Sequence, residues 1–503
     1  MKLISLHYSD PNNSLQTYKF NFDNERHESN TLEPLCFVGL NGSGKSKLLE
    51  VLAKIFFELD RLWRNTNKMK PVVSANFRFE YHLLPSRMHK NVVIIGEVGK
   101  PLVIMADGQA LLPEKLPLIM PSNIVGYSSG HNETISALFH ELREREFERI
   151  RKEVREGEQG SRALSRTMFL DRDSTKLSLL TAFIFGGKSG RDGFPSADSS
   201  QRLLSKFSEF IHLRQLLSFQ IVVDTDSGRI VLSQRMERVL EKLKRCALMV
   251  NSNEQGNNRS YEMDFFLCEQ TKDAFFKEFG TAQDFFEELY ELYSLNLISS
   301  SKNKIHRVFS IPETELKVLV QDPLAETHYL NLSDGEHQFI QVFTSLVYFA
   351  KQDSIFLLDE PESHFNPAWR AKFVLVIDEL LDKSQKSSEF LISTHSPYLV
   401  SACKKRNVFK FSRNAEVGCI DYQPLIDETF GASFDVLLKE LFDMQGLVAE
   451  IARAALQEVI ESSFTTQEKV DILKKDFGDS FEKRLLINML EKGLFNAVSD
   501  RIR

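Results

Sequence analysis

The segment with the most distinctive chemistry is Gly-Leu-Asn-Gly-Ser-Gly-Lys-Ser at residues 39–46, which matches the phosphate-binding pattern G-x-x-x-x-G-K-[ST]. Glycines in such a loop allow several backbone N–H groups to converge on phosphate oxygens without Cβ clashes. In this pattern Lys45 reaches the β- and γ-phosphates of a nucleotide, and the Ser46 hydroxyl is a ligand of Mg²⁺. The sequence therefore predicts a nucleotide site formed by Gly39, Asn41, Gly42, Ser43, Gly44, Lys45 and Ser46.

The residues on both sides of this loop fit the structural context that the motif needs. Residues 34–39 form a continuous apolar run, which is typical of a buried strand. After the loop, apolar residues recur at helical spacing over residues 47–62, and the N-terminus of this helix adds a positive dipole near bound phosphate. A strand, a phosphate loop and an amphipathic helix are therefore expected in succession.

A second candidate segment is Ser-Ile-Phe-Leu-Leu-Asp-Glu-Pro-Glu at residues 354–362, an apolar strand that ends in acidic residues. Such a strand presents its carboxylates at the carboxyl edge of a parallel sheet, where ligands bind in α/β folds. Asp359 is expected to hold Mg²⁺, directly or through water. Glu360 is expected to accept a proton from the attacking water as general base. Taken alone, the pair could also be a surface feature of a strand end.

A third buried strand is predicted within residues 390–400, and His395 lies at its end. This histidine comes one strand–helix–strand step after Asp359, so its side chain is expected beside the two acids. There it could hydrogen-bond the γ-phosphate or the attacking water, whereas a single histidine after a strand is more often structural.

The segment Asn-Leu-Ser-Asp-Gly-Glu-His-Gln-Phe at residues 331–339 has the pattern of a capped helix start. Ser333 is a favoured N-cap residue, and early acids suit the positive end of a helix. In isolation this pattern indicates a helix start without a ligand.

Together, and in this order, the four segments resemble the motif set of ABC-type ATPases. The segment around Ser333 is similar to the signature motif of that family, and its Asp334 resembles RecF, OLD and related non-transporter members. The resemblance implies ATP and Mg²⁺ as cofactors. It also implies that Ser333, Gly335 and Glu336 of one chain cap the ATP bound by another, so that a homodimer or a higher oligomer completes the site.

The Q-loop glutamine of ABC-type ATPases is not evident at the expected place, which leaves open how hydrolysis is coupled to movement. Residues 126–133 occupy a suitable position at the end of a predicted strand. Within them, Ser128, His131 and Asn132 are candidates for contacting Mg²⁺ or lining the dimer face, and an ordinary surface loop is the alternative. Gln109 is a further candidate.

The predicted fold class is α/β: an ABC-type P-loop ATPase head with a mixed sheet and an antiparallel β subdomain, a helical insertion and a helical C-terminal tail. Residues 1–140 and 310–412 are expected to form the two halves of the head, because the motifs and strand-like segments lie there. Residues 141–309 are expected to be a mainly helical insertion. Residues 413–503 are expected to be helical and to offer a partner-binding region.

Shorter segments add detail to this outline. Residues 140–158 predict a very charged, solvated helix, and residues 219–233 predict a hairpin. Residues 235–245 form the most cationic helix, which could contact a phosphate backbone or simply be a solvated face. The C-terminal tail carries apolar stripes that could bury a partner helix or pack on its own head: Leu437, Leu438, Leu441, Phe442, Leu485, Leu486, Met489 and Leu490.

The composition of the 503 residues is that of a globular protein of two to four domains, with 42% hydrophobic and 26% charged residues. A net charge of −7 excludes a uniformly cationic nucleic-acid binder. Five scattered cysteines without a Cys-x-x-Cys pair argue against zinc and disulfides. No apolar run reaches about 18 residues, so no membrane segment is expected and a cytoplasmic location is predicted.

Several classes of ABC-type ATPase fit this chain poorly. Lys45 and Ser333 are too far apart in the sequence for a transporter subunit. Sustained heptads are lacking, which argues against the long coiled-coil arms of SMC and Rad50 proteins. Neither a Toprim-like strand nor an HNH or other metal-nuclease cluster is visible. The sequence therefore predicts an ATPase without a nuclease centre of its own.

The remaining features resemble the PtuA family of restriction system-associated ATPases in Septu anti-phage defence. They are the chain length and the segments at residues 127–133, 332–339 and 429–442. The resemblance implies an ATPase that controls a small HNH nuclease similar to PtuB, which acts on DNA or RNA. In retron-associated members, a reverse transcriptase and its nucleic acid are further partners. The alternatives are a RecF-like ATP-dependent DNA-repair clamp and a non-hydrolysing ATP-sensing scaffold.

Overall fold

The structure is a computed structural model and describes residues 1–11, 13–22, 32–64, 73–83, 90–129, 137–139, 141, 166–171, 174–188, 196–225, 232–255, 258–296, 307–313, 315–320, 325–413, 420–423, 425, 427–442, 444 and 448–492. The chain divides into two compact units, Met1–Ala432 and Ser433–Arg503, and each is described by itself.

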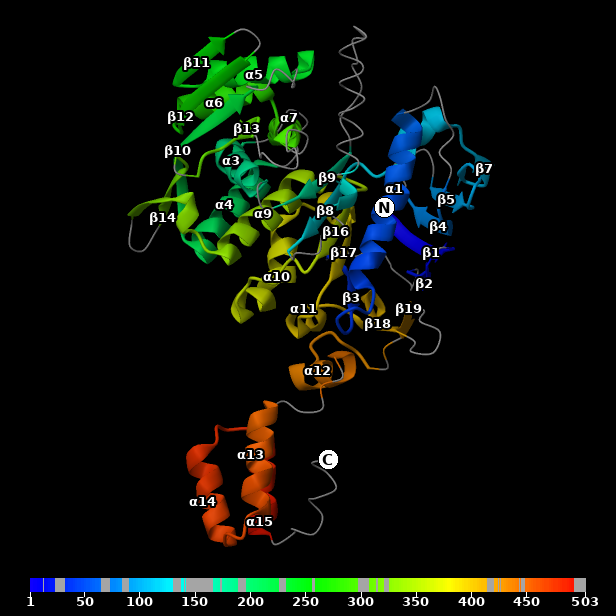
Figure 1. The fold of residues 1–503 in the computed structure, drawn as a ribbon, viewed down its shortest axis with the longest axis vertical. Coiled ribbons are helices and arrows are strands. Elements are labelled where there is room, and N and C mark those ends of the chain that lie inside the picture. Colours follow the sequence, from blue (N-terminus) through cyan, green and yellow to red (C-terminus); the bar gives the residue numbers. More distant parts are fainter. Residues whose placement is uncertain are drawn as a thin grey trace. The chain divides into compact units, whose positions relative to one another are not determined.

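The core of the larger unit is a seven-stranded mixed sheet of order β19-β18-β3-β17-β16-β8-β9 (Figure 1). Its strands are β3 (Leu35–Val38), β8 (Ile124–Ser128), β9 (Thr167–Leu170), β16 (Ile355–Asp359), β17 (Glu389–Ser393), β18 (Val408–Arg413) and β19 (Ile420–Gln423). Every pairing is parallel except that of β19 with β18. The central strands β3, β16 and β17 are buried at every position, because their apolar sequences are covered on both faces.

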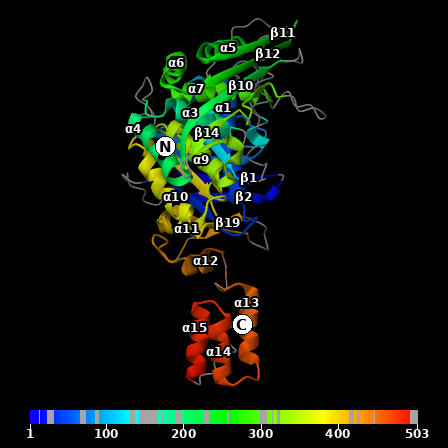
Figure 2. The same ribbon diagram turned by 90° about the vertical axis from the view of Figure 1, so that its left-hand side faces the viewer.

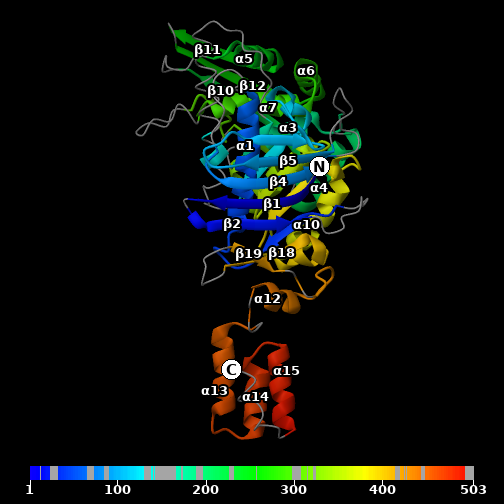
Figure 3. The same ribbon diagram turned by 90° about the vertical axis from the view of Figure 1, so that its right-hand side faces the viewer.

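A six-stranded antiparallel sheet of order β2-β1-β4-β5-β6-β7 forms a second layer (Figure 3). Its strands are β1 (Lys2–Asp10), β2 (Asn13–Asn21), β4 (Asn76–His82), β5 (Asn91–Gly96), β6 (Val103–Ala106) and β7 (Gln109–Ala110). Helix α1 (Lys45–Arg64) packs against both sheets: Phe56 contacts Phe79 and Tyr81 of β4, and the same apolar cluster includes Ile355 and Leu391 of the mixed sheet. The predicted α/β class, with a mixed sheet and an antiparallel β subdomain, is confirmed.

A third sheet, of order β11-β12-β10-β14-β15, combines strands of the predicted helical insertion with strands that follow it, and β13 pairs with β10. Its strands are β10 (Leu213–Asp224), β11 (Met249–Gln255), β12 (Asn258–Phe266), β13 (Phe309–Ser310), β14 (Lys317–Val320) and β15 (Ala325–His328). The helices around it are α3 (Thr175–Phe185), α4 (Ala197–Ile211), α5 (Gln234–Cys246), α6 (Glu269–Phe279) and α7 (Ala282–Ser294). The sequence does not predict this sheet, because β11 is mostly polar and lacks the alternation that indicates a strand.

The C-terminal half of the larger unit adds the helices that surround the predicted motifs. They are α9 (Asp334–Phe349), α10 (Pro367–Leu380) and α11 (Pro397–Ser401), with short 3-10 turns η1 (Pro113–Leu118), η2 (Tyr329–Asn331), η3 (Gln385–Ser387) and η4 (Lys405–Asn407) elsewhere. Helix α9 is buried along most of its length; its Phe339 stacks on Phe210 of α4, and its Phe349 meets Phe286 of α7 edge to face. The helix that starts at the signature-like segment is therefore a core element of the unit.

The smaller unit is helical over its described residues (Figure 2). It contains α12 (Phe434–Phe442), α13 (Glu450–Glu461), α14 (Thr466–Asp476) and α15 (Phe481–Glu491). One apolar cluster joins the last three helices through Leu456, Ile460, Val470, Leu473, Leu486 and Leu490. The sheet of the larger unit continues past residue 412, where the helical region was expected to start, because β19 pairs with β18.

Three local predictions can now be compared with the structure. In place of the hairpin over residues 219–233, β10 pairs with β12 and β14, while residues 226–231 lie outside the described part. The charged helix over residues 140–158 also lies almost entirely outside it. Basic residues of α5 are paired with acids, for example Lys242 with Glu288 at 2.7 Å. Within the described part, no helix has the length and apolar content needed to span a membrane.

Candidate active site

The carboxyl ends of neighbouring parallel strands bring the predicted acids together with two serines. Asp359 ends β16, and its register partners are Ser393 at the end of β17 and Ser128 at the end of β8. Ser393 in turn pairs with Phe37 of β3, the strand that leads into the phosphate loop. Because parallel strands end at the same edge of a sheet, segments far apart in the sequence meet at this edge.

The phosphate loop adopts backbone conformations that favour glycine. Gly39 has a φ of 141° and Gly44 a φ of 102°. A Cβ at Gly39 would lie 2.5 Å from the carbonyl oxygen of Phe411, and a Cβ at Gly44 would lie 2.3 Å from Ile420 Cδ1. These neighbours belong to β18 and β19, so the last two strands of the sheet pack directly against the phosphate loop. The loop motif alone does not predict this contact.

Lys45, the first residue of α1, directs its ammonium group into the loop. It donates hydrogen bonds to the carbonyl oxygens of Gly39 at 2.9 Å and Leu40 at 3.2 Å, and it lies 3.0 Å from His395 Nε2. Burial lowers the pKa of Lys45 to about 8, although the charges of Glu360 and Asp359 favour the ammonium form. A bound phosphate could therefore replace these groups as the hydrogen-bond partner of Lys45.

Asp359 is the acceptor for a set of serine hydroxyls. Ser46 Oγ donates to Asp359 Oδ1 at 2.8 Å, and Ser393 Oγ donates to the same oxygen. Ser128 Oγ approaches Asp359 Oδ2 at 3.5 Å from the opposite strand. One carboxylate with adjacent hydroxyls is an oxygen donor set of the kind that Mg²⁺ prefers.

Glu360 has an unusual backbone conformation directly after β16. Its φ of 50° lies in the left-handed region, which is uncommon for a residue with a Cβ and is typical of functional sites. Its N–H donates to the carbonyl oxygen of Ser393 at 3.0 Å, which anchors this turn to β17. Burial and the neighbouring Asp359 raise the pKa of the Glu360 carboxyl. A raised pKa suits a general base that must take a proton from water.

His395 lies where the strand order predicts it, beside the acids. Its Nε2 is 3.7 Å from Glu360 Oε1 as well as 3.0 Å from the Lys45 ammonium. Burial and the positive charge of Lys45 lower the pKa of the imidazole to about 4. At neutral pH the imidazole is therefore uncharged. It can donate or accept a hydrogen bond without adding a charge to the site.

The loop also contains a polar atom that fits a phosphate ligand. Ser43 is 5% exposed, and its buried Oγ has no hydrogen-bond partner among the described residues. Buried hydroxyls are rarely left unpaired in folded proteins. Together with the Lys45 ammonium and the Asp359 carboxylate, this hydroxyl makes the donor set compatible with a magnesium-bound nucleoside triphosphate.

The signature-like segment forms the capped helix start that the sequence predicts. Ser333 is the N-cap of α9, with a reciprocal capping box in which Ser333 N–H donates to Glu336 Oε2 at 2.6 Å. Ser333 and Asp334 are exposed. Among the hydrogen bonds of the described residues, none connects Ser333 to the phosphate loop of its own chain. A Cβ on Gly335 would lie 2.8 Å from the carbonyl oxygen of His364, so the start of α9 packs closely on the segment after the acidic strand.

The structure separates the four Q-loop candidates. Ser128 lies next to Asp359, as described above, whereas Gln109 is exposed on the edge strand β7 of the antiparallel sheet. His131 and Asn132 lie outside the described residues. Ser128 is therefore the candidate that the fold brings to the site.

Two residues that the sequence reasoning did not single out complete the site. Glu362 is 3% exposed and accepts a hydrogen bond from the Thr394 hydroxyl, which itself accepts from Ser396 N–H at 2.9 Å. Burial raises the pKa of Glu362 to about 7. Gln338 of α9 contacts the turn that follows β16. The last acid of Asp-Glu-Pro-Glu is the signal in the sequence that could have drawn attention to Glu362.

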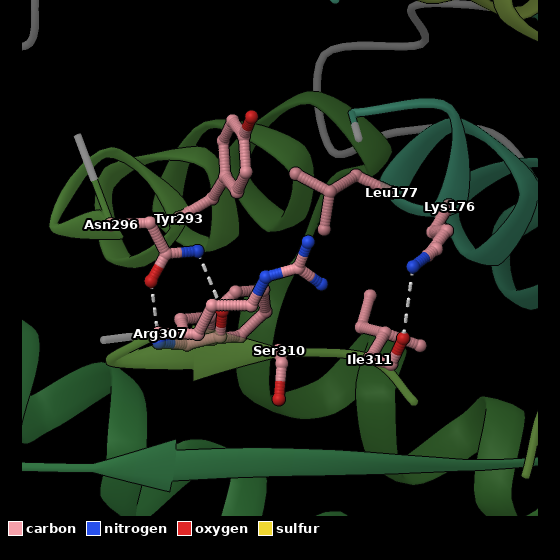
Figure 4. A pocket seen from close by; sticks show the side chains of 8 residues that line it. Lys176, Leu177, Tyr293, Asn296, Arg307, Ser310 and Ile311 are labelled. Atoms are coloured by element: carbon pink, nitrogen blue, oxygen red, sulfur yellow. Dashed lines mark hydrogen bonds between the residues drawn. The ribbon is translucent and has the colours of Figure 1, made fainter. Parts of the chain in front are cut away.

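A small cavity elsewhere in the larger unit does not offer a second nucleotide site (Figure 4). It lies between α3, α7 and β13 and has a volume of about 20 Å³, enough for about one water. Lys176 on its wall donates to the carbonyl oxygen of Ile311 at 3.2 Å and pairs with Glu313 at 2.9 Å. Across the described ranges, no group of three or more His, Cys, Asp and Glu side chains has the arrangement of a metal site.

Comparison with known proteins matches part of the chain. Residues 255–401, which contain α9, the acidic strand and His395, match a family model described as "AAA domain, putative AbiEii toxin, Type IV TA system". Protein ea59 of Escherichia phage lambda is 27% identical over 152 residues. That match covers 30% of this chain and spans 27% of the length of the phage protein.

Similar solved structures include heads of SMC proteins. An Smc head bound to the C-terminal winged-helix domain of ScpA is 13% identical, with a TM-score of 0.35, and the match covers 84% of this chain and 98% of that one. The SMC head domain from Thermotoga maritima is 9% identical, with a TM-score of 0.33, and the match covers 85% of this chain and 100% of that one.

The site and the partial family match involve the same segments of the chain. A glycine-rich phosphate loop, an acidic strand end and a histidine meet at one edge of a mixed α/β sheet. The matched AAA domain contains three of the predicted motifs. The site has the arrangement of a P-loop nucleotide-binding site, and residues 255–401 are similar to an AAA domain.

Proposed function

We propose that this site binds ATP with Mg²⁺ and hydrolyses the bond between its β- and γ-phosphates. The observation that carries the proposal is the meeting of Lys45, Ser46 and Asp359, since Ser46 Oγ lies 2.8 Å from Asp359 Oδ1 and the Lys45 ammonium lies in the same loop. The loop N–H groups and Lys45 would hold the phosphates, and Ser46 and Asp359 would hold the metal. When bound, Mg²⁺ neutralises charge that develops on the transferred group.

The remaining residues act on the attacking water. Glu360 accepts its proton, and its raised pKa brings the carboxylate closer to the basicity that this step needs. His395, uncharged at neutral pH, donates or accepts a hydrogen bond at the same place and orients the water against the γ-phosphate. Ser128, opposite Asp359, would serve as the Q-loop residue and would help to hold the metal or its water.

The capping half of the site comes from a second copy of the chain. Ser333 is exposed at the N-terminus of α9, and its hydroxyl donates to Glu336 Oε2 at 2.7 Å. A γ-phosphate offered by another subunit would give this hydroxyl and the Gly335 N–H a charged acceptor at a helix N-terminus. ATP therefore joins two heads into a homodimer, and neither head completes the site alone.

The biological role that fits best is a regulatory ATPase in a bacterial anti-phage defence complex. The family model that matches residues 255–401 bears the description of a putative AbiEii toxin, and the motif set resembles PtuA of Septu systems. In this proposal the ATP-joined dimer controls a separate HNH nuclease similar to PtuB. The nuclease, not the ATPase, attacks DNA or RNA.

Co-purification tests this role. The chain is expressed together with its genomic neighbour, and native mass spectrometry measures the composition of the complex with and without ATP. We expect at least two copies of this chain bound to a small nuclease whose cleavage of nucleic acid changes with nucleotide. ATP-dependent DNA binding without a nuclease would instead support a RecF-like clamp. Turnover no higher than that of Glu360→Gln would support a non-hydrolysing scaffold.

A further inference from the structure

Gln338 is a buried polar residue on α9, one turn beyond the exposed Ser333. Its side chain is 3% exposed, although a glutamine on a helix usually faces solvent. Burying an amide is costly unless its donors and acceptor are paired. The partners of Gln338 therefore indicate why a glutamine occupies this position.

All of these partners lie on two segments at the catalytic edge of the sheet. Gln338 Nε2 donates to Tyr127 Oη at 2.8 Å, to Ser363 Oγ at 3.3 Å and to the carbonyl oxygen of Glu360 at 3.4 Å. Gln338 Oε1 accepts from His364 N–H at 2.9 Å. One side chain thus connects α9 to β8 and to both ends of the turn from Glu360 to His364.

This turn is the one that holds the proposed general base. Glu360 has a φ of 50°, a conformation that persists in folded proteins only where neighbours enforce it. Ser393 holds the Glu360 N–H from the β17 side, and Gln338 contacts the Glu360 carbonyl from the α9 side. The backbone of the base is therefore held from two directions, and α9 supplies one of them.

The start of α9 and this turn are also in direct steric contact. At Gly335 a Cβ would lie only 2.8 Å from the carbonyl oxygen of His364, so there is no space between the two segments for independent movement. A displacement of the α9 N-terminus must consequently be followed by the turn that carries Glu360.

We propose that Gln338 is a positioning residue that couples the signature helix to the general base. When Ser333 engages the nucleotide of the partner subunit, the position of α9 fixes the Glu360 backbone through the Gln338 amide. Capping of the partner's nucleotide then accelerates hydrolysis in the chain's own site. This inference rests on the proposed function, because it assumes that Glu360 is the general base.

Gln341 provides a matched control on the same helix. It is also a buried glutamine, 4% exposed, but its amide donates to the carbonyl oxygen of Asp171 and to Ser174 Oγ at the start of α3. Replacing Gln341 therefore removes a buried amide of the same kind from α9 and leaves the contacts of the turn after β16 unchanged. Any effect specific to Gln338 must therefore come from its contacts with that turn or with Tyr127.

The experiment compares Gln338→Met with Gln341→Met in the full chain, because methionine is similar in size to glutamine and cannot donate. Nucleotide affinity, kcat and thermal stability are measured for each. We expect Gln338→Met to lower kcat at least about tenfold, since small misplacement of a catalytic group is costly, while ATP affinity is retained. We expect Gln341→Met to keep the wild-type kcat, although it loses about as much thermal stability as Gln338→Met.

Gln338→Glu tests the donor separately and guards against misfolding of the first variant. It keeps the size of the side chain and an acceptor for His364 N–H, and at a pH where its carboxylate is ionised it cannot donate to the Glu360 carbonyl. A low kcat in this variant supports the proposal. Equal loss of kcat in the Gln338 and Gln341 variants, or normal kcat in Gln338→Glu, overturns it.

The proposed function is checked in the same assay with Lys45→Ala. If the wild-type protein shows no Lys45-dependent turnover, the proposed hydrolysis fails, and the coupling role falls with it. If turnover depends on Lys45 but is indifferent to Gln338, only the coupling role fails.

Discussion

Ser46 Oγ donates a 2.8 Å hydrogen bond to Asp359 Oδ1, although the two residues are 313 positions apart. One belongs to the first turn of α1 and the other to the last position of β16. The bond joins the phosphate loop to the acidic strand and defines where a metal ion would lie between them.

Lys45→Ala should weaken ATP binding at least about tenfold, because charge-assisted hydrogen bonds to phosphate are lost. Isothermal titration calorimetry measures the affinity directly. Lys47→Ala is the matched control, since Lys47 lies two residues further along and pairs with Glu50 at 2.7 Å. Equal binding by both variants would contradict the role assigned to Lys45.

Glu360→Gln should retain ATP binding and lower turnover by about 10²–10⁴, the usual contribution of a general base. Phosphate release under saturating ATP measures the effect. Glu379→Gln on α10 serves as the control, because Glu379 pairs with Lys206 at 2.9 Å and does not reach the site. Turnover of Glu360→Gln at the wild-type rate would remove Glu360 from the mechanism.

Ser333→Arg should bind ATP normally yet fail to dimerise and to hydrolyse it, because a bulky cation at the helix start blocks closure of the second head. Mixing this variant with Lys45→Ala should restore activity, with at most one competent site per dimer. Light scattering and phosphate release measure the two steps. Normal hydrolysis by Ser333→Arg alone, without any gain on mixing, would refute capping in trans.

Glu362→Gln should change how stability depends on pH. Burial raises the pKa of Glu362 to about 7 in the folded protein, so the folded state holds a proton that the unfolded state releases near pH 4.5. The wild-type protein should therefore lose stability as pH rises from about 4.5 to about 7, by roughly 2 to 3 kcal/mol between pH 5 and 8. Urea unfolding of both proteins at pH 5 and 8 should show this loss in the wild type and a smaller one in Glu362→Gln.

Ser128→Ala should raise the Mg²⁺ concentration needed for half-maximal turnover, because one hydroxyl beside Asp359 is removed. The neighbouring Ser129→Ala is the control for general effects on the end of β8. A magnesium titration of ATP hydrolysis gives both values. An unchanged requirement in Ser128→Ala would return the Q-loop role to His131 or Asn132.

The local motifs could be predicted because each is a short run of residues with its own physical requirement. The phosphate loop needs glycines and a lysine in consecutive positions, and Asp359 and Glu360 follow an apolar run that is recognisable as a buried strand. The capping box of Ser333 and Glu336 is equally local. The third sheet could not be predicted in the same way, because polar strands such as β11 depend on pairing with distant neighbours.

By itself, then, the sequence determined the α/β class, the phosphate loop, the acidic strand end, His395 and the capped start of α9. Only the tertiary structure decided the partners of these groups, because strand register and helix packing are set by contacts between remote segments. Register places Ser128 beside Asp359, and packing buries Glu362 and directs Gln338 to the turn of Glu360. Burial among those partners, which no local pattern encodes, is also what lowers the pKa of His395 and raises that of Glu362.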